Sequence, residues 1–387
     1  MPESVGYVET QRVVLFTEGD PLVLESGETL APVEVAYETY GALAPDGSNA
    51  VFVCHALTGD AHAAGHHGDP ERPGWWDTLI GPGKPLDTDR LFVICPNLLG
   101  GCRGSTGPSS TNPATGKQYG LRFPHFTVAD LVTVHRRLLA HLGIERLHGA
   151  IGGSLGGMQV LQWAIDHPGE VGHGVLVCAS ARLTAQNVAL SAVARASITG
   201  DEHFADGDYY GTGLTPDVGL SVARMLAHIT YVSEESLGLK FGRSRRSDRP
   251  TFGIDFEVES YLDYQAKSFL ERFDANTYLY LTRVMDYFDP FADEATAVEQ
   301  LAASETDFLI VAFNSDWRFP TAHSAEIARV VGLSGRPILF EEVASPWGHD
   351  SFLLTVPRYH ELVAAQLSGV APVDAGDAAR RLRRRSA

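Results

Sequence analysis

Several short runs of the chain are almost wholly apolar, which is the pattern of strands buried on both faces of a parallel sheet. Between some of these runs, apolar residues recur every three or four positions, as in amphipathic helices. The pattern predicts strands at 50–59, 90–97, 146–153 and 171–180 and helices at 127–144 and 154–168. Strands that alternate with helices in this way predict an α/β fold, with a mostly parallel central sheet flanked by helices.

The ends of the two predicted helices carry the expected signals. Thr127 is predicted as the N-cap of the first helix and Gly143 as its end. Pro168 is predicted to end the second helix. Between 98 and 120 the chain is dense in Gly, Ser, Thr and Pro, and an irregular segment of that length is often functional.

The pattern changes after residue 181. Helical spacing dominates as far as residue 297, interrupted by a basic stretch at 240–250. A buried strand then follows at 305–320, a helix at 322–332, a strand at 336–343 and a closing helix at 350–369. The predicted organisation is a first core part at 1–180, a helical lid at 181–297, a second core part at 298–371 and a disordered basic tail at 372–387.

The stretch AIGGSLGGMQ places four glycines around Ser154, at the junction of a predicted strand and a predicted helix. Gly152, Ser154 and Gly156 match G-x-S-x-G, in which small residues let strand and helix approach while the turn exposes the serine hydroxyl. A plain glycine-rich turn and a phosphate-binding loop are the alternatives. We interpret Ser154 as a nucleophile; Gly153 and Gly157 either clear space for a bulky acyl group or only pack.

A nucleophilic serine needs a histidine base and a carboxylate that orients it, in the chain order Ser, Asp, His on this type of fold. Asp316 directly follows a buried strand, and His349 lies in a turn before the last helix. Asp307 fits the acid less well because it precedes the strand, and the competing bases His323 and His360 look helical and surface-facing.

The same chemistry needs two backbone N–H donors for the oxyanion. The residue after the nucleophile, Leu155, supplies one, and Leu57 in the turn CHALTG is our candidate for the other.

Charge and composition narrow the function further. The formal net charge is −18, which argues against broad contacts with nucleic acid or an anionic membrane. The four cysteines show no C-x-x-C spacing, no run of 18 apolar residues occurs, and the N-terminus lacks signal-peptide features. We therefore expect a cytoplasmic protein that does not span a membrane.

Two further patterns in the sequence could indicate other chemistry. His55 and Asp60 spell H-x4-D, a pattern of some lipid acyltransferases, but they lie on the turn already needed for the oxyanion. His62, His66 and His67 could form a metal cluster, yet Gly65 interrupts them and no third-ligand motif is evident. We predict no metal and no resident cofactor.

Several separate blocks together resemble the homoserine O-acetyltransferase family of α/β-hydrolase-fold enzymes, over about residues 10–370: HALTGDAH, NLLGGCRGSTGPSS, GGSLGGMQ, LTRVMDYFD, NSDWRFP and GHDSFLL. The resemblance implies acetyl transfer from acetyl-CoA, as co-substrate, to Ser154 and then to L-homoserine, in methionine biosynthesis. It also implies that Arg224 pairs with the homoserine carboxylate and Asp350 with its ammonium group, and that the lid forms a homodimer interface. A solvated helix face is the alternative for Arg224.

Around this resemblance other interpretations stay open. Tyr231 either lines the substrate pocket or packs in the core, and the basic stretch 240–249 could meet the CoA phosphates. A homoserine O-succinyltransferase, a serine O-acetyltransferase, a carboxylester hydrolase and a non-catalytic binding protein on the same scaffold are the rival functions.

Overall fold

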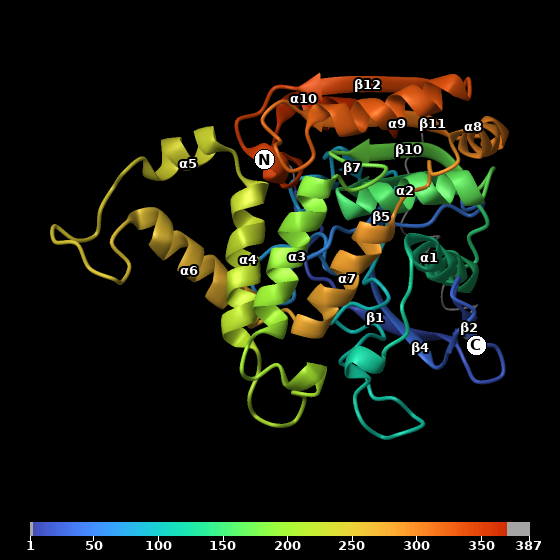
Figure 1. The fold of residues 1–387 in the computed structure, drawn as a ribbon. Helices are drawn as coiled ribbons and strands as arrows, with labels where there is room; N and C mark the ends of the chain where they lie inside the picture. The colour runs from blue at the N-terminus through green and yellow to red at the C-terminus, as the bar shows by residue number, and fades with distance from the viewer. Residues whose placement is uncertain (1–2, 370–387) are drawn as a thin grey trace.

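The apolar runs of the chain pair into one eight-stranded sheet in the computed structural model, which describes residues 3–369 (Figure 1). Its strands, in spatial order, are β1 (Gln11–Phe16), β4 (Val33–Tyr40), β8 (Phe92–Pro96), β5 (Ala50–Cys54), β9 (Leu147–Gly153), β10 (Val171–Val177), β11 (Asp307–Phe313) and β12 (Ile338–Val343). Both pairings of β4 are antiparallel, and those from β8 to β12 are parallel. The predicted mostly parallel sheet is therefore confirmed.

Alternate residues of the central strands enter two separate cores, one on each face of the sheet. Phe52 of β5 belongs to a core that also contains residues of α1 (Val128–Leu142), α2 (Leu155–Asp166) and α9 (Thr321–Leu333). Val51 and Val53 point the other way, into a core shared with α10 (Pro357–Gln366). Because both faces are covered, the strands are apolar at successive positions, which explains the continuous apolar runs in the sequence.

The predicted ends of α1 are confirmed. The Thr127 side chain accepts a hydrogen bond from the Asp130 N–H, and Asp130 bonds back to the Thr127 N–H as a capping box. Gly143 ends the helix in the left-handed conformation, with φ of 72°.

The prediction of a single closing helix at 350–369 is wrong. The structure has a short 3₁₀ helix, η3 (Gly348–Leu353), and only then α10, which begins at Pro357. Proline lacks the N–H that a helix interior needs and disfavours a helical residue before it, so it can start a helix but not continue one.

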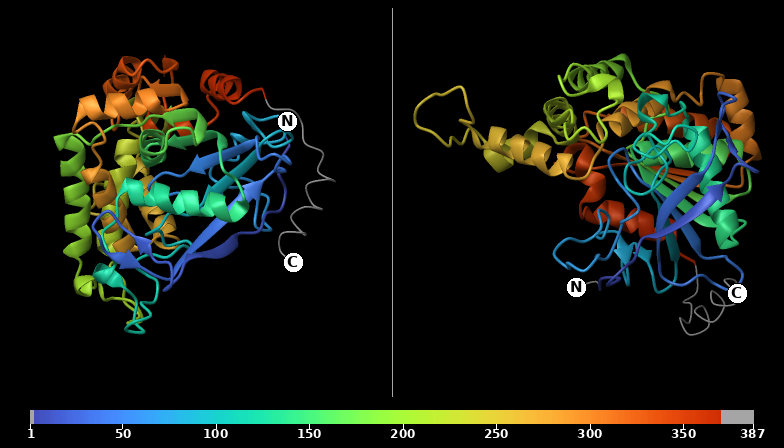
Figure 2. Two further views of the ribbon diagram at one scale, coloured as in Figure 1. Left: turned by 90° about the vertical axis from the view of Figure 1, so that its right-hand side faces the viewer. Right: turned by 90° about the horizontal axis from the view of Figure 1, so that it is seen from below.

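The helices predicted after residue 181 form an insertion between β10 and β11. They are α3 (Ala185–Thr199), α4 (Asp217–Tyr231), α5 (Glu234–Phe241), α6 (Glu257–Leu270) and α7 (Ala275–Tyr287). Figure 1 shows α3, α4 and α7 beyond the arrowheads of the strands, at the carboxyl edge of the sheet. Figure 2 shows that α5, α6 and the loop between them project from the rest of the molecule.

The predicted boundary at 297 falls inside α8 (Glu294–Ala303), which runs across it. The remaining short strands are β2 (Leu22–Val23), β3 (Thr29–Leu30), β6 (Ile80–Gly81) and β7 (Leu86–Asp87), and the other 3₁₀ helices are η1 (Gly120–Arg122) and η2 (Ala205–Gly207). No helix within residues 3–369 is long and apolar enough to cross a membrane. The predicted basic tail lies outside the described residues.

Candidate active site

Ser154 stands in the tight turn between β9 and α2. Its backbone has φ of 57° and ψ of −123°, a conformation that non-glycine residues rarely adopt. Its N–H donates a hydrogen bond to the Val177 carbonyl, which ties the turn to the neighbouring strand β10. The strained turn predicted from G-x-S-x-G is therefore present, and it leaves the side chain 6% exposed.

Each of the four glycines around Ser154 meets a packing limit. A Cβ at Gly152 would overlap the backbone of Gly156, and a Cβ at Gly156 would overlap the Cys54 carbonyl oxygen. A Cβ at Gly153 would lie 2.5 Å from the Phe352 ring, and one at Gly157 would lie 2.6 Å from the Ala179 methyl group. Close packing thus accounts for Gly153 and Gly157, without any need to clear space for an acyl group.

Asp316 and His349 come together as the sequence predicted. His349 Nδ1 donates to Asp316 Oδ2 across 2.6 Å, and both side chains are buried. The other carboxylate oxygen of Asp316 accepts the N–H groups of Arg318 and Phe319, each at 2.9 Å. The carboxylate is therefore held by backbone donors and can orient the imidazole.

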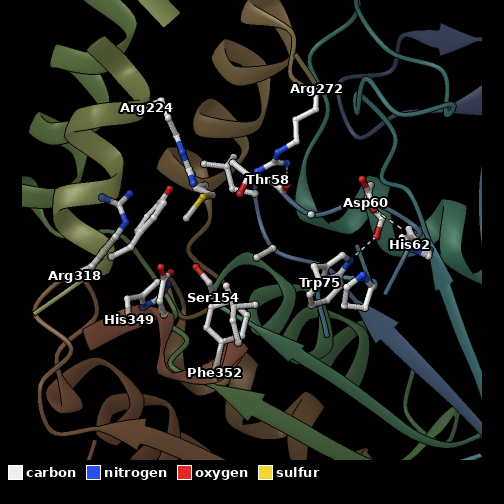
Figure 3. A pocket seen from close by; sticks show the side chains of 18 residues that line it. Thr58, Asp60, His62, Trp75, Ser154, Arg224, Arg272, Arg318, His349 and Phe352 are labelled. Carbon is white, nitrogen blue, oxygen red and sulfur yellow. Dashed lines mark hydrogen bonds between the residues drawn. The ribbon is translucent and has the colours of Figure 1, made fainter. Parts of the chain in front are cut away.

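A cavity of about 310 Å³ brings the predicted site residues together (Figure 3). Its lining includes Ser154, His349, Leu57, Arg224 and Asp350. Ser154 Oγ has no hydrogen-bond partner within residues 3–369, so its hydroxyl is free to meet a ligand. Tyr231 also lines the cavity, which resolves its two interpretations in favour of the pocket.

The two predicted oxyanion donors flank this cavity. Leu57 lines it, and Leu155 is the first residue of α2, directly after Ser154. Neither N–H is donated to a backbone carbonyl within the described part of the chain. The alternative acid and bases lie away from the cavity. Asp307 is the first residue of β11, at the amino end of the strand, and neither His323 nor His360 lines the cavity.

The lining is unusually rich in charge. Besides Arg224 it includes the guanidinium groups of Arg272 and Arg318. Neither is among the site residues predicted from the sequence, although Arg318 stands in the block NSDWRFP, two positions after Asp316. Within residues 3–369 none of these three arginines forms an ion pair. The acids on the lining are Asp350 and Asp60, and Asp60 is paired with Arg103 at 3.3 Å.

Asp350 is strongly affected by its surroundings. Burial raises the pKa of its carboxyl to about 6, an increase that nearby His349 and Arg224 partly oppose. Asp350 is therefore largely ionised at pH 7, and it becomes neutral as the pH falls below about 6.

The structure adds a residue to the histidine cluster considered in the sequence. Glu38, fully buried in β4, accepts from His62 Nδ1 at 3.0 Å and from His67 Nε2 at 2.8 Å. Thr10 and Tyr40 hydroxyls also donate to this carboxylate, so hydrogen bonds already satisfy it. The side chains of Glu38, His62 and His67 lie close enough together to hold a metal ion, and the absence of a metal stays a prediction.

Comparison with known proteins agrees with this geometry. Residues 49–355 match the family model described as alpha/beta hydrolase fold. The chain is 59% identical to a homoserine O-succinyltransferase of Nocardioides sp. (strain ATCC BAA-499 / JS614), over 94% of this chain and 99% of that protein. It is 50% identical to a homoserine O-acetyltransferase of Rhodopseudomonas palustris (strain BisB18), over 94% and 92% of the two chains. The crystal structure of homoserine O-acetyltransferase from Bacillus anthracis is similar with a TM-score of 0.86 and 28% identity, over 95% and 100% of the chains.

Replacing Gly156 with alanine tests the packing around the turn. Because the added Cβ would overlap the Cys54 carbonyl oxygen, we expect Gly156→Ala to lower the free energy of unfolding by at least about 2 kcal/mol in urea denaturation. Gly332→Ala in α9 is the matched control: nothing lies within 4 Å of its added Cβ, so helix propensity should raise stability by up to about 1 kcal/mol. A Gly156→Ala protein as stable as the parent would contradict this account of the turn.

Proposed function

Because the chain belongs to the α/β-hydrolase-fold enzymes and, among them, to the homoserine O-acyltransferases, we propose that it transfers a succinyl group from succinyl-CoA to L-homoserine. The product would be O-succinyl-L-homoserine, and a covalent succinyl-serine on Ser154 would be the intermediate. The observation that carries the choice of donor is the unpaired, buried guanidinium of Arg318 on the cavity lining.

In the first half-reaction, Ser154 Oγ attacks the thioester carbonyl carbon while His349 Nε2 takes the hydroxyl proton. Asp316 accepts the Nδ1–H of the imidazole and stabilises the imidazolium that forms. The N–H groups of Leu57 and Leu155 bind the oxyanion of the tetrahedral intermediate. When the intermediate collapses, the C–S bond breaks and CoA leaves with the proton from His349.

In the second half-reaction, the hydroxyl of L-homoserine attacks the acyl-serine. His349 takes the proton from this hydroxyl and returns it to Ser154 Oγ as the ester bond to the enzyme breaks. Homoserine is a zwitterion, and the cavity offers an arginine and an ionised acid to match it. Arg224 binds the carboxylate in this mechanism and Asp350 binds the ammonium group.

With Arg224 assigned to homoserine, the cavity still holds two guanidinium groups without a carboxylate partner. Arg318 is 7% exposed, and within residues 3–369 its guanidinium donates one hydrogen bond, to Thr230 Oγ1 at 3.2 Å. Figure 3 shows it on the same side of the cavity as His349. A buried cation is costly unless a partner compensates its charge. The acyl group of succinyl-CoA carries a free carboxylate that can pair with Arg318, whereas the acyl group of acetyl-CoA carries none.

Acetyl-CoA, the donor predicted from the sequence, is the second candidate. The name of the Rhodopseudomonas palustris relative favours it, as does that of the similar Bacillus anthracis structure. The more similar Nocardioides relative is named for succinyl transfer. Together with Arg318, this identity gives succinyl-CoA the greater support.

The inserted helices serve this chemistry by covering the site. Arg224 and Tyr231 of α4 and Met285 of α7 line the cavity from the insertion side. We propose that this cover excludes water, so that homoserine rather than water accepts the acyl group. The lid, the homodimer, the cytoplasmic location and the contact of 240–249 with CoA phosphates remain predictions.

The direct test of the function follows free thiol release with each donor, in the presence and absence of L-homoserine. We expect release from succinyl-CoA that depends on homoserine and that falls by several orders of magnitude in Ser154→Ala. Release that ignores homoserine would identify a hydrolase instead. Homoserine-dependent release from acetyl-CoA but not from succinyl-CoA would reverse the choice of donor.

Arg318→Leu tests the donor site separately. Loss of a charged, buried contact to the succinyl carboxylate should lower kcat/KM for succinyl-CoA by about 10- to 100-fold. Activity with acetyl-CoA should stay the same or rise, because acetyl has no carboxylate to bind. Arg318→Lys, which keeps the charge, should retain more succinyl transfer than Arg318→Leu. Equal losses with both donors would remove Arg318 from donor recognition.

The pKa of Asp350 makes a prediction about pH. Below about pH 6 this carboxyl is protonated and can no longer attract the ammonium group of homoserine. KM for homoserine should therefore rise about tenfold between pH 7 and pH 5, as one proton binds. Asp350→Asn should show a high KM that is nearly independent of pH over this range. A parent enzyme whose KM stays constant from pH 7 to pH 5 would contradict the role of Asp350.

A further inference from the structure

One fully buried glutamine lies beneath the two oxyanion donors. Gln159 belongs to the second turn of α2, and its side chain has no exposed surface. Its Nε2 donates two hydrogen bonds of 3.1 Å, one to the His55 carbonyl and one to the Leu155 carbonyl. One amide group therefore joins the segment after β5, which contains Leu57, to the start of α2, which contains Leu155.

The orientation of this amide is itself determined. Gln159 Oε1 lies 2.9 Å from Nε2 of His135 in α1, and both side chains are buried. Burial lowers the pKa of His135 to about 4, so the imidazole is neutral at pH 7. Because Gln159 Nε2 must donate to two carbonyls, Oε1 is the acceptor and His135 carries its proton on Nε2.

The segment on the other side of this link is anchored as well. His55 Nε2 accepts the Leu98 N–H at 3.0 Å, so the turn after β5 is also held to the turn after β8. The network therefore runs from α1 through Gln159 to both oxyanion segments and on to a third turn.

We infer that Gln159 is a positioning residue that sets the distance between the N–H groups of Leu57 and Leu155, and so the geometry of the oxyanion site. The inference rests on the proposed acyl transfer. The contact between Gly156 and the Cys54 carbonyl limits how closely the two segments can approach. The two hydrogen bonds of Gln159 limit how far they can separate.

The rate of acyl transfer depends strongly on where the two oxyanion N–H groups lie. Preorganised donors act only at the position where negative charge develops, and a displacement of about 1 Å can cost on the order of a hundredfold in rate. Loss of the two Gln159 hydrogen bonds should therefore weaken binding of the tetrahedral intermediate more than binding of the substrates.

Gln159→Met tests this inference, because methionine fills a similar volume but cannot donate to the two carbonyls. We expect kcat with succinyl-CoA to fall by about 10- to 100-fold, while KM for homoserine stays within twofold. The matched control is Gln162→Met, on the same helix, where the lost bond goes to Asp166 at 2.8 Å and not to the oxyanion segments. Its kcat should stay within twofold of the parent value.

The second measurement is the affinity for n-butylboronic acid, which forms a tetrahedral adduct on a nucleophilic serine and places an oxygen in the oxyanion site. Calorimetry should show its dissociation constant rising in Gln159→Met by about the factor by which kcat falls, and unchanged in Gln162→Met. A merely structural role for Gln159 would lower the melting temperature without this change.

Gln159→Leu is the second variant should the methionine protein not fold, because its apolar side chain also lacks both N–H donors and adds no buried charge. It should show the same loss of boronate affinity. Boronate affinity within twofold of the parent in a folded Gln159 variant would overturn the inference. The boronate experiment needs neither donor nor homoserine, so a parent enzyme that fails to transfer succinyl groups refutes the proposed function separately.

Discussion

The close approach of the α2 N-terminus to the end of β5 is the constraint on which the rest of the site depends. Gly156 lies so near the Cys54 carbonyl that no side chain fits between them. This approach forces Ser154 into a strained turn and leaves the first N–H groups of α2 beside the turn that contains Leu57. A larger residue at Gly152 or Gly156 would open the turn and move Ser154 away from the N–H groups of Leu57 and Leu155.

Around this rigid centre the charged groups come from elements far apart in the chain. Arg224 lies on α4 and Arg272 just after α6, whereas Arg318 lies in the turn that follows β11 and Asp350 in η3. Buried guanidinium groups without acidic partners destabilise the empty enzyme, and a ligand that carries carboxylates recovers part of that cost. The charge of the cavity thus favours ligands that carry carboxylates.

Much of this architecture could be predicted from the sequence because its signals are local. The helix capped by Thr127, the strained turn at Ser154 and the positions of Asp316 and His349 after late strands all follow from short-range patterns that the structure reproduces. The closing helix is an exception, because apolar spacing alone continues it through Pro357, where the structure instead begins α10. The partnership of Glu38 with His62 could not be predicted, since it joins a strand to a distant loop and leaves no periodic signal.

The identity of the acyl donor belongs to this second, non-local kind of information. In the proposed mechanism Ser154, His349 and Asp316 act on a carbonyl group that every acyl donor shares, so their presence cannot separate succinyl from acetyl transfer. Discrimination requires a group that contacts the part of the acyl chain where the donors differ, and a hydrophobic pocket distinguishes small differences only weakly. A buried arginine discriminates more strongly, because without a carboxylate it remains unpaired. One buried arginine is therefore enough to separate two acyl donors that differ only in a carboxylate.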